Sequence, residues 1–212
     1  MFNDRFNLTK LVLEGKKTQT RRIEIDCNIR FYLYNYEGSY PKIEDNKICI
    51  YSDDGYLLAS KNTRYKIGEE VAIAQSYSQC GNFPDYELDE DGCPVMPKRS
   101  GYFNKMFVKA ELMPYRIRIT NIKVERLQDI SDEDCLKEGI TEVSGEFEAH
   151  TVLQDGYYGE RLRVIKRYYG IQYYELGESP REAYGTLIDK ISGKGTWESN
   201  PYVIVYEFEL IK

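Results

Sequence analysis

The spacing of apolar residues predicts a protein that mixes helices and strands. Leu8, Leu11 and Val12 recur at helical spacing, so we expect a short amphipathic helix there. Gly15 can end that helix because glycine adopts the left-handed backbone conformation at little cost. The basic residues that follow Gly15 therefore start where this helix ends.

Strand patterns follow in three places. Residues 116–124 alternate polar and apolar side chains, with one slip at Thr120 and Asn121 that could mark a bulge. Residues 71–74 form an apolar run after a turn, and residues 202–210 form a long aromatic and β-branched run. We expect these segments to belong to the main sheet.

Two further helices have clear start signals. Ser131 precedes an acidic first turn, and the helix should end before Gly139. Ser179 precedes a proline and carries a glutamate three residues later, which is typical of a capping box. That helix should continue to about residue 191 and end at Gly193.

The rest of the chain is broken by turn residues. Residues 27–64 contain short aromatic runs, including residues 31–34, and are predicted to form β-hairpins with the clearest turn at residues 53–55. Residues 79–105 are predicted to form a long loop that could act as a lid, and residues 143–177 to form short strands and loops.

Composition narrows the possible functions. The net charge of −6 argues against a protein that coats nucleic acid through bulk charge, because that mode needs many phosphate contacts. Twenty tyrosines favour a β-rich fold. The five cysteines contain no C-x-x-C pair, so neither a zinc ribbon nor a disulfide framework is indicated. The first residues resemble no signal peptide, and we expect a cytoplasmic protein without a membrane partner.

The most unusual segment is the basic stretch from Gly15 to Arg22, with the sequence Gly-Lys-Lys-Thr-Gln-Thr-Arg-Arg. In a strand, Lys17 and Arg21 would share one face, whereas Thr20 and Arg22 would share the other. A turn or bulge near Thr20 would bring Lys17 and Thr20 together. The purely structural alternative is a solvated basic edge strand.

This stretch contains the motif Gly-x-Lys-x-x-Thr-x-Arg, formed by Gly15, Lys17, Thr20 and Arg22. With the strands and capped helices above, it resembles the ASCH family of the PUA-like superfamily, in particular the longer members from bacteria and their phages. The resemblance covers about residues 5–25, 64–78, 106–141 and 178–211. The minimal family domain has no counterpart of residues 27–64, 79–105 and 143–177, which would be insertions.

The resemblance implies one α+β, β-rich domain spanning residues 1–212: a small, mostly antiparallel PUA-like β-barrel with flanking helices and inserted hairpins. It also implies a cleft for RNA or a modified nucleoside or base. Small bacterial members hydrolyse acetylcytidine with the motif lysine and threonine and a later glutamate, which match Lys17, Thr20 and Glu138 here. Lysine would activate the threonine nucleophile, and glutamate would shuttle the proton.

Two functions therefore stay open. The first is binding of RNA, single-stranded nucleic acid or a nucleoside, and the second is amide hydrolysis of an acylated nucleoside. The candidate catalytic residues are Lys17, Thr20 and Glu138. The candidate ligand-binding residues are Gly15, Arg21, Arg22, Arg116 and Arg118. A third possibility is an accessory protein whose insertions bind another protein.

Other features carry less weight. Paired tyrosines could stack on bases, although such residues more often fill cores and cover sheet edges. Trp197 is assigned to packing, and Lys194-Gly195-Thr196 lacks the full spacing of a phosphate loop. His150 is the only histidine, and no spacing of cysteines or carboxylates supports a metal site, so we expect no metal. We also expect no cofactor. The tyrosine pairs considered above for stacking on bases are Tyr157-Tyr158, Tyr168-Tyr169 and Tyr173-Tyr174.

Overall fold

The computed structural model describes residue 2 and residues 6–82, 84, 90–91, 101–152, 158–171 and 174–211, without the side chains of residues 143–152, 158–168, 171 and 174–176. The chain forms two compact units. Unit 1 comprises Met1–Glu125 and Tyr202–Lys212, and unit 2 comprises Arg126–Pro201. The single domain inferred from the resemblance stays a prediction.

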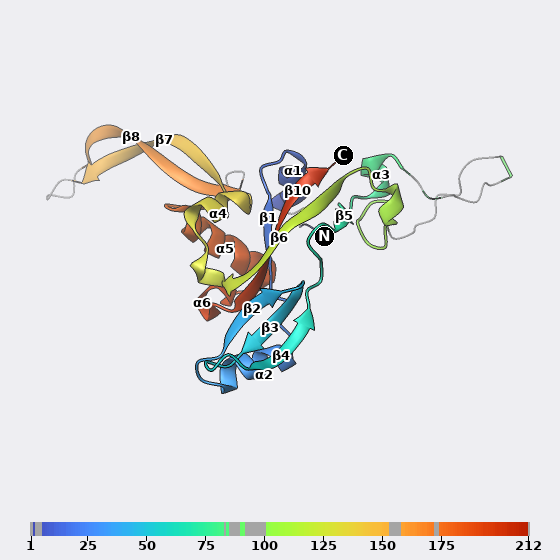
Figure 1. Ribbon diagram of the computed structural model, residues 1–212. Helices are drawn as coiled ribbons and strands as arrows, with labels where there is room; N and C mark the ends of the chain where they lie inside the picture. The colour runs from blue at the N-terminus through green and yellow to red at the C-terminus, as the bar shows by residue number, and fades with distance from the viewer. Residues whose placement is uncertain are drawn as a thin grey trace. The chain divides into compact units, whose positions relative to one another are not determined.

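A four-stranded sheet organises unit 1. Its strand order is β1 (Gln19–Arg22), β10 (Tyr202–Ile211), β6 (Arg116–Arg126) and β5 (Glu70–Ala72). The β1 strand pairs antiparallel with β10, and β5 pairs antiparallel with β6 (Figure 1). The strands expected at residues 116–124 and 202–210 and the main-sheet position of residues 71–72 are thus confirmed.

One face of this sheet carries the main core. Ile117, Ile119, Tyr206 and Phe208 are buried and pack with Val12 of α1 (Leu8–Leu13). The amphipathic helix predicted at the N-terminal end is therefore confirmed, and Gly15 follows it with a φ of 70°. The slip in β6 is real, because its burial pattern shows two successive exposed residues before the next buried isoleucine.

The strand expected at residues 31–34 is wrong, because this segment lies in α2 (Cys27–Asn35). Asp26 caps the helix by accepting a hydrogen bond from the backbone N–H of Ile29 at 3.0 Å. Ile29 packs against Ile48 and Ile50, so one face of the helix is buried. Tertiary packing thus overrides the strand preference of a local aromatic run.

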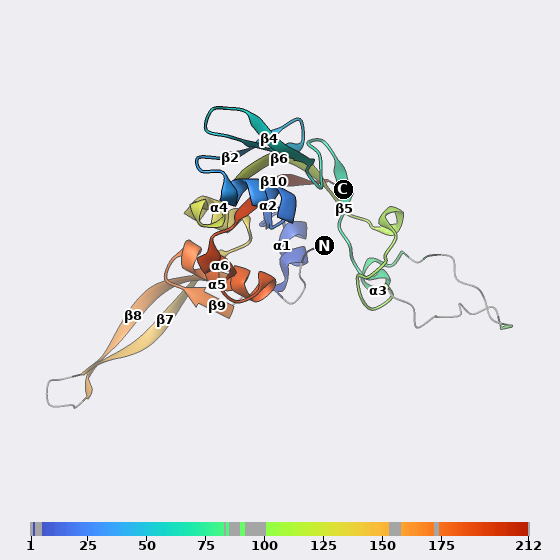
Figure 2. The ribbon, with the colours of Figure 1, turned by 90° about the horizontal axis from the view of Figure 1, so that it is seen from below.

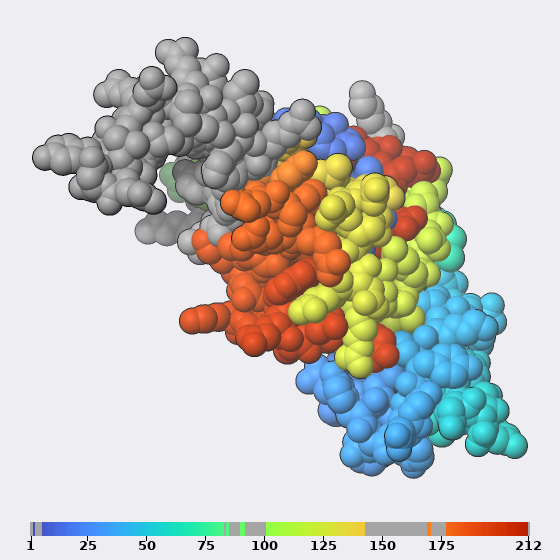
Figure 3. Space-filling model, turned by 90° about the vertical axis from the view of Figure 1, so that its left-hand side faces the viewer, coloured from blue at the N-terminus to red at the C-terminus, as the bar shows by residue number. Residues whose placement is uncertain are grey.

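The predicted hairpins after α2 are confirmed. β2 (Tyr40–Glu44), β3 (Lys47–Tyr51) and β4 (Leu57–Asn62) form an antiparallel sheet against which α2 packs (Figure 2). Gly55 lies in the expected turn and its N–H donates to the carbonyl of Ser52 at 2.9 Å. In the space-filling view, the segment from α2 to β4, coloured blue to cyan, forms one compact block (Figure 3).

The loop predicted for residues 79–105 is only partly described. It begins at the short helix α3 (Tyr77–Cys80), and much of residues 83–100 lies outside the described residues. The end of the loop is anchored, because the N–H of Tyr77 donates to the carbonyl of Gly101 at 2.8 Å. The helical turn η2 (Ala110–Leu112) then leads into β6.

Unit 2 contains the third sheet and most of the remaining helices. The sheet is formed by β7 (Thr141–Val152), β8 (Tyr158–Ile171) and β9 (Tyr174–Gly177). The helices are η3 (Leu127–Asp129), α4 (Asp132–Lys137), α5 (Pro180–Ser192) and α6 (Thr196–Ser199).

Short strands were expected over residues 143–177, and this is wrong for β7 and β8. The two strands pair antiparallel along almost their whole length and form a long ribbon (Figure 1). Glycines in this segment predict turns when only the local sequence is considered. In the structure, cross-strand hydrogen bonds keep them within continuous strands. Tyr157 and Tyr173 of the predicted stacking pairs lie outside the described residues.

The predicted helix starts in unit 2 are confirmed. Ser131 accepts a hydrogen bond from the N–H of Asp134 at 3.1 Å, and Ser179 accepts one from the N–H of Glu182 at 3.2 Å. The protein is thus α+β with several antiparallel sheets, as expected. Across the described strands these sheets are separate, and they close no barrel. Among the described helices, none has both the length and the apolar character that crossing a membrane requires.

Candidate functional site

The basic stretch forms β1 and the segment before it, and its side chains alternate in burial. Lys17, Gln19 and Arg21 are buried, whereas Thr20 and Arg22 are partly exposed. The alternation follows from the strand geometry, in which successive side chains point to opposite faces. A fully solvated basic strand is therefore not what the chain forms.

Thr20 and Arg22 lie on the core face of the sheet and line a small pocket in unit 1. The pocket has a volume of about 30 Å³. Its other walls are aromatic and aliphatic, with apolar residues of β5 and β6 completing them. The aromatic lining residues are Phe2, Tyr65, Tyr206 and Phe208. The structure thus brings two predicted site residues together beside aromatic rings.

The aromatic walls are ordered by contacts with one another. The ring centroids of Phe2 and Phe208 are 5.7 Å apart, and those of Tyr65 and Tyr206 are 5.2 Å apart with the rings nearly perpendicular. Such tilted and edge-on pairs are favourable geometries for aromatic side chains. The aromatic rings that line the pocket are therefore held in place by packing against one another.

Glu24 adds a carboxylate next to this pocket. The hydroxyl of Tyr206 donates to Oε2 of Glu24 at 2.8 Å and accepts from the backbone N–H of Arg64 at 3.1 Å. Burial and the Glu24 carboxylate raise the pKa of Tyr206, so its phenol stays protonated at neutral pH. Sequence reasoning missed Glu24, although it continues the alternation of Thr20 and Arg22.

The opposite face of β1 is polar and internally bonded. Arg21 donates from Nε and Nη2 to Oε1 of Glu125 at 2.9 and 2.7 Å, and from Nη1 to Oε1 of Gln19 at 3.3 Å. Gln19 donates to Glu207 at 3.2 Å, and Lys123 pairs with Glu125 at 3.1 Å. Arg21 therefore has a structural role here, since its guanidinium is held within the protein.

Arg116 and Arg118 also serve the sheet rather than the pocket. The side chain of Arg118 is exposed and pairs with Glu70 and Glu209, each at 3.1 Å. The hydrogen bond to Glu70 raises the pKa of Arg118 above its already high value. Arg116 reaches the carbonyl of Ala110 at 3.5 Å. These two candidate ligand-binding residues thus lie away from the pocket, and Arg118 has carboxylate partners.

The other predicted site residues lie elsewhere. Gly15 is exposed at the end of α1, and Lys17 is buried but does not line the pocket. Glu138 belongs to unit 2, where it follows α4 and its N–H donates to the carbonyl of Asp134 at 2.9 Å. Glu138 is buried, and burial is compatible with both a structural and a catalytic role of its carboxylate.

The described residues include no group of three or more histidine, cysteine, aspartate and glutamate side chains that could hold a metal ion. The side chain of His150 lies outside the described residues. The chemistry that the pocket offers is thus an arginine cation, a hydroxyl and aromatic surface.

The resemblance to the ASCH family rests on the motif residues and on the order of the elements. Comparison of the chain with protein-family models, with curated proteins and with solved structures gives no match.

Proposed function

We propose that the chain is an ASCH-type, PUA-like protein whose unit 1 binds a base or nucleoside, free or within single-stranded RNA, beside Thr20 and Arg22. The observation that carries the proposal is the pocket that these two residues share with four aromatic side chains. Small-molecule sites combine apolar walls with a few polar groups. Aromatic faces stack on bases, and a guanidinium binds phosphate or a carbonyl oxygen.

The origin of the strands supports the family assignment. All four strands of the β1–β10–β6–β5 sheet come from segments that carry the resemblance. The sheet of β2 to β4 and the ribbon of β7 and β8 come from segments predicted to be insertions. On this proposal the four-stranded sheet corresponds to part of the PUA-like barrel, and the other two sheets are formed by inserted segments.

The size of the pocket sets a condition on binding. A volume of about 30 Å³ has room for one or two waters, whereas ligand sites usually measure about 300–1,000 Å³. A ligand must therefore displace part of the wall. Phe2 lies outside the sheet and contacts Phe208, so it is the side chain that a base can replace with least disturbance to the strands.

Calorimetric titration with cytidine, acetylcytidine and a short single-stranded RNA tests the proposal. We expect Arg22→Ala and Thr20→Val to weaken binding of at least one ligand by about tenfold, since each removes a polar contact. Arg30→Ala is the matched control, because Arg30 is an exposed arginine of α2 that does not line the pocket. Equal affinities for wild type and Arg22→Ala would contradict the proposal.

Amide hydrolysis of an acylated nucleoside is the second candidate, favoured by the pocket that Thr20 and Arg22 line together. Thr20 would add to the acyl carbonyl and Arg22 would hold the oxyanion. The C–N bond would break with transfer of a proton to the leaving amine, and water would release the acid. Lys17 is buried, as are Gln19 and Arg21, which lie on the face of β1 opposite Thr20. This similarity weakens the assignment of Lys17 as the base that activates Thr20.

Loss of the acetyl group from acetylcytidine measures this activity directly. We expect Thr20→Ala to abolish turnover and Thr20→Ser to retain part of it. Lys17→Ala and Glu138→Gln test the two remaining predicted catalytic residues. Absence of turnover at high enzyme concentration would leave binding as the function of the pocket.

A further inference from the structure

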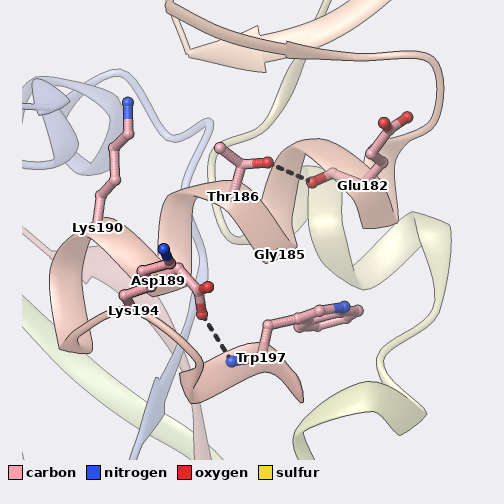
Figure 4. A pocket seen from close by; sticks show the side chains of 7 residues that line it. All are labelled: Glu182, Gly185, Thr186, Asp189, Lys190, Lys194 and Trp197. Atoms are coloured by element: carbon pink, nitrogen blue, oxygen red, sulfur yellow. Dashed lines mark hydrogen bonds between the residues drawn. The ribbon is translucent and has the colours of Figure 1, made fainter.

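Unit 2 contains a separate groove along one face of α5, with a volume of about 490 Å³ (Figure 4). This volume lies within the usual range for small-molecule sites. Glu182, Gly185, Asp189 and Lys190 of α5 line it, as do Lys194 and Trp197 from the following turn and α6. The spacing of the α5 residues places them on one helical face.

Trp197 lines this groove, with its ring lying next to α5 (Figure 4). Its indole lies against Gly185, where a Cβ atom would come within 3.0 Å of the ring. Glycine inside a helix is unfavourable relative to alanine, so its presence in α5 is explained by the close approach of the indole. Tyr184 contacts the ring edge-on with centroids 6.1 Å apart. Gly185 and Tyr184 therefore fix the position of the indole.

Asp189 holds the backbone that carries this ring. Its Oδ1 accepts from the N–H of Trp197 at 2.7 Å and its Oδ2 accepts from the N–H of Gly195 at 3.0 Å. These bonds lower the pKa of Asp189, so it is a carboxylate at neutral pH. Because both oxygens accept backbone hydrogen bonds, the charge of Asp189 is largely compensated within the loop.

The other charges lie at opposite ends of the groove. Lys190 and Lys194 lie to one side of Trp197 in Figure 4, and Glu182 lies to the other. Glu182 and Lys190 are eight positions apart on α5, which corresponds to about 12 Å along the helix axis. The groove thus has a cationic end, an aromatic middle and an acidic end.

We propose that this groove binds a nucleoside monophosphate with an amino-bearing base, either free or as the phosphorylated end of an RNA strand. The phosphate lies near Lys190 and Lys194, and the base stacks on Trp197. Oε2 of Glu182 accepts from the backbone N–H of Glu178 at 2.8 Å, so Oε1 is the oxygen that accepts a hydrogen bond from the exocyclic amine. The inference is independent of the proposed function of unit 1, because the groove and its ligand contacts lie wholly within unit 2.

The protein supplies its own reporter, since Trp197 is the only tryptophan. We expect titration with cytidine monophosphate to quench its fluorescence saturably. Cytidine and inorganic phosphate, added separately, should each bind at least about tenfold more weakly, since each makes only part of the contacts. A 5′-phosphorylated oligoribonucleotide that binds more tightly than the mononucleotide identifies a strand end as the ligand, and equal affinity identifies the free nucleotide.

Variants separate the two ends of the groove. Lys194→Ala should weaken cytidine monophosphate about tenfold and leave cytidine unchanged, because only the phosphate contact is lost. Glu182→Gln should reduce the preference for cytidine monophosphate over uridine monophosphate, which lacks the amine. Lys137→Ala is the matched control, since Lys137 is an exposed lysine of unit 2 paired with Asp134 away from the groove residues.

Absence of saturable quenching at millimolar nucleotide would overturn the proposal, and so would equal affinities of wild type and Lys194→Ala in the quenching titration. Trp197→Phe, followed by calorimetry, should retain binding that Trp197→Leu loses, and equal affinities of these two variants would exclude stacking. Binding at the Thr20 pocket is measured separately, by calorimetry with Arg22→Ala. If that binding is absent, the fluorescence of Trp197 still reports binding in the groove of unit 2.

Discussion

Arg21 of β1 forms an ion pair with Glu125 of β6, with 2.7 Å between Nη2 and Oε1. The two strands are not neighbours, because β10 lies between them in the sheet. The Arg21 side chain is fully buried and that of Glu125 is 16% exposed. The ion pair therefore spans three strands on the face of the sheet opposite Thr20 and Arg22, and it fixes the edge strand that carries these two residues.

Replacing Arg21 with methionine should destabilise the protein by about 3 kcal/mol, the lower end of the range for breaking a buried ion pair. The lower end applies because Glu125 keeps Lys123 as a partner. Urea unfolding followed by circular dichroism measures the change. Lys42→Met is the control, since its pair with Glu44 is exposed and should change stability by less than about 1 kcal/mol. Equal effects of the two substitutions would contradict this role.

Tyr206→Phe should lower stability at neutral pH by about 1–2 kcal/mol, because it removes a buried hydroxyl that bonds to Glu24 and to the N–H of Arg64. The raised pKa of Tyr206 also predicts an alkaline effect. The unfolded chain loses this proton near pH 10, about the usual tyrosine value, before the folded protein does. Stability contributed by Tyr206 is therefore present below about pH 10 and lost as the pH rises above it.

Unfolding midpoints measured from about pH 8 to pH 11 test this linkage. Tyr206→Phe should lose less stability over the alkaline part of the range than wild type does. Tyr56→Phe should behave as wild type, because Tyr56 is 73% exposed. An alkaline slope that Tyr206→Phe leaves unchanged would mean that other groups govern this pH dependence.

Asp26→Ala should destabilise α2 by about 1 kcal/mol, the usual effect of removing a helix cap. Asp26→Asn separates two contributions, because asparagine keeps the cap to the N–H of Ile29 but loses the ion pair with Lys61. We expect the asparagine variant to be close to wild type, since the ion pair is partly exposed. Far-ultraviolet circular dichroism with urea unfolding compares the variants, and equal losses would assign the effect to Lys61.

Asp189→Ala should shift the fluorescence of Trp197 to longer wavelength at neutral pH, because the backbone of Trp197 loses the acceptor that holds it. The lowered pKa of Asp189 gives the wild type an acid transition. The contribution of Asp189 is present above about pH 4, the unfolded value, and is lost as the pH falls through the lower folded pKa. Glu198→Gln is the control on α6 and should keep both the neutral spectrum and the acid transition.

Local chemistry in the sequence determined the best predicted elements. Ser131 and Ser179 begin helices because their hydroxyls accept hydrogen bonds from N–H groups of their own first turns, which needs no distant partner. The alternation of residues 116–124, including its slip, predicted which side chains of β6 are buried. In the basic stretch, strand alternation alone predicts that Arg21 lies on the face opposite Thr20 and Arg22.

Tertiary contacts decided the rest, because they join residues far apart in the chain. Residues 27–35 form a helix since Ile29 finds Ile48 and Ile50 to pack against, which an isolated aromatic run does not reveal. Arg21 became structural and Arg22 a pocket residue only when β10 and β6 supplied Glu125 on one face and aromatic walls on the other. Strand alternation separates the side chains by face, but the free energy of burying a charge depends on the partner that the folded chain brings to it.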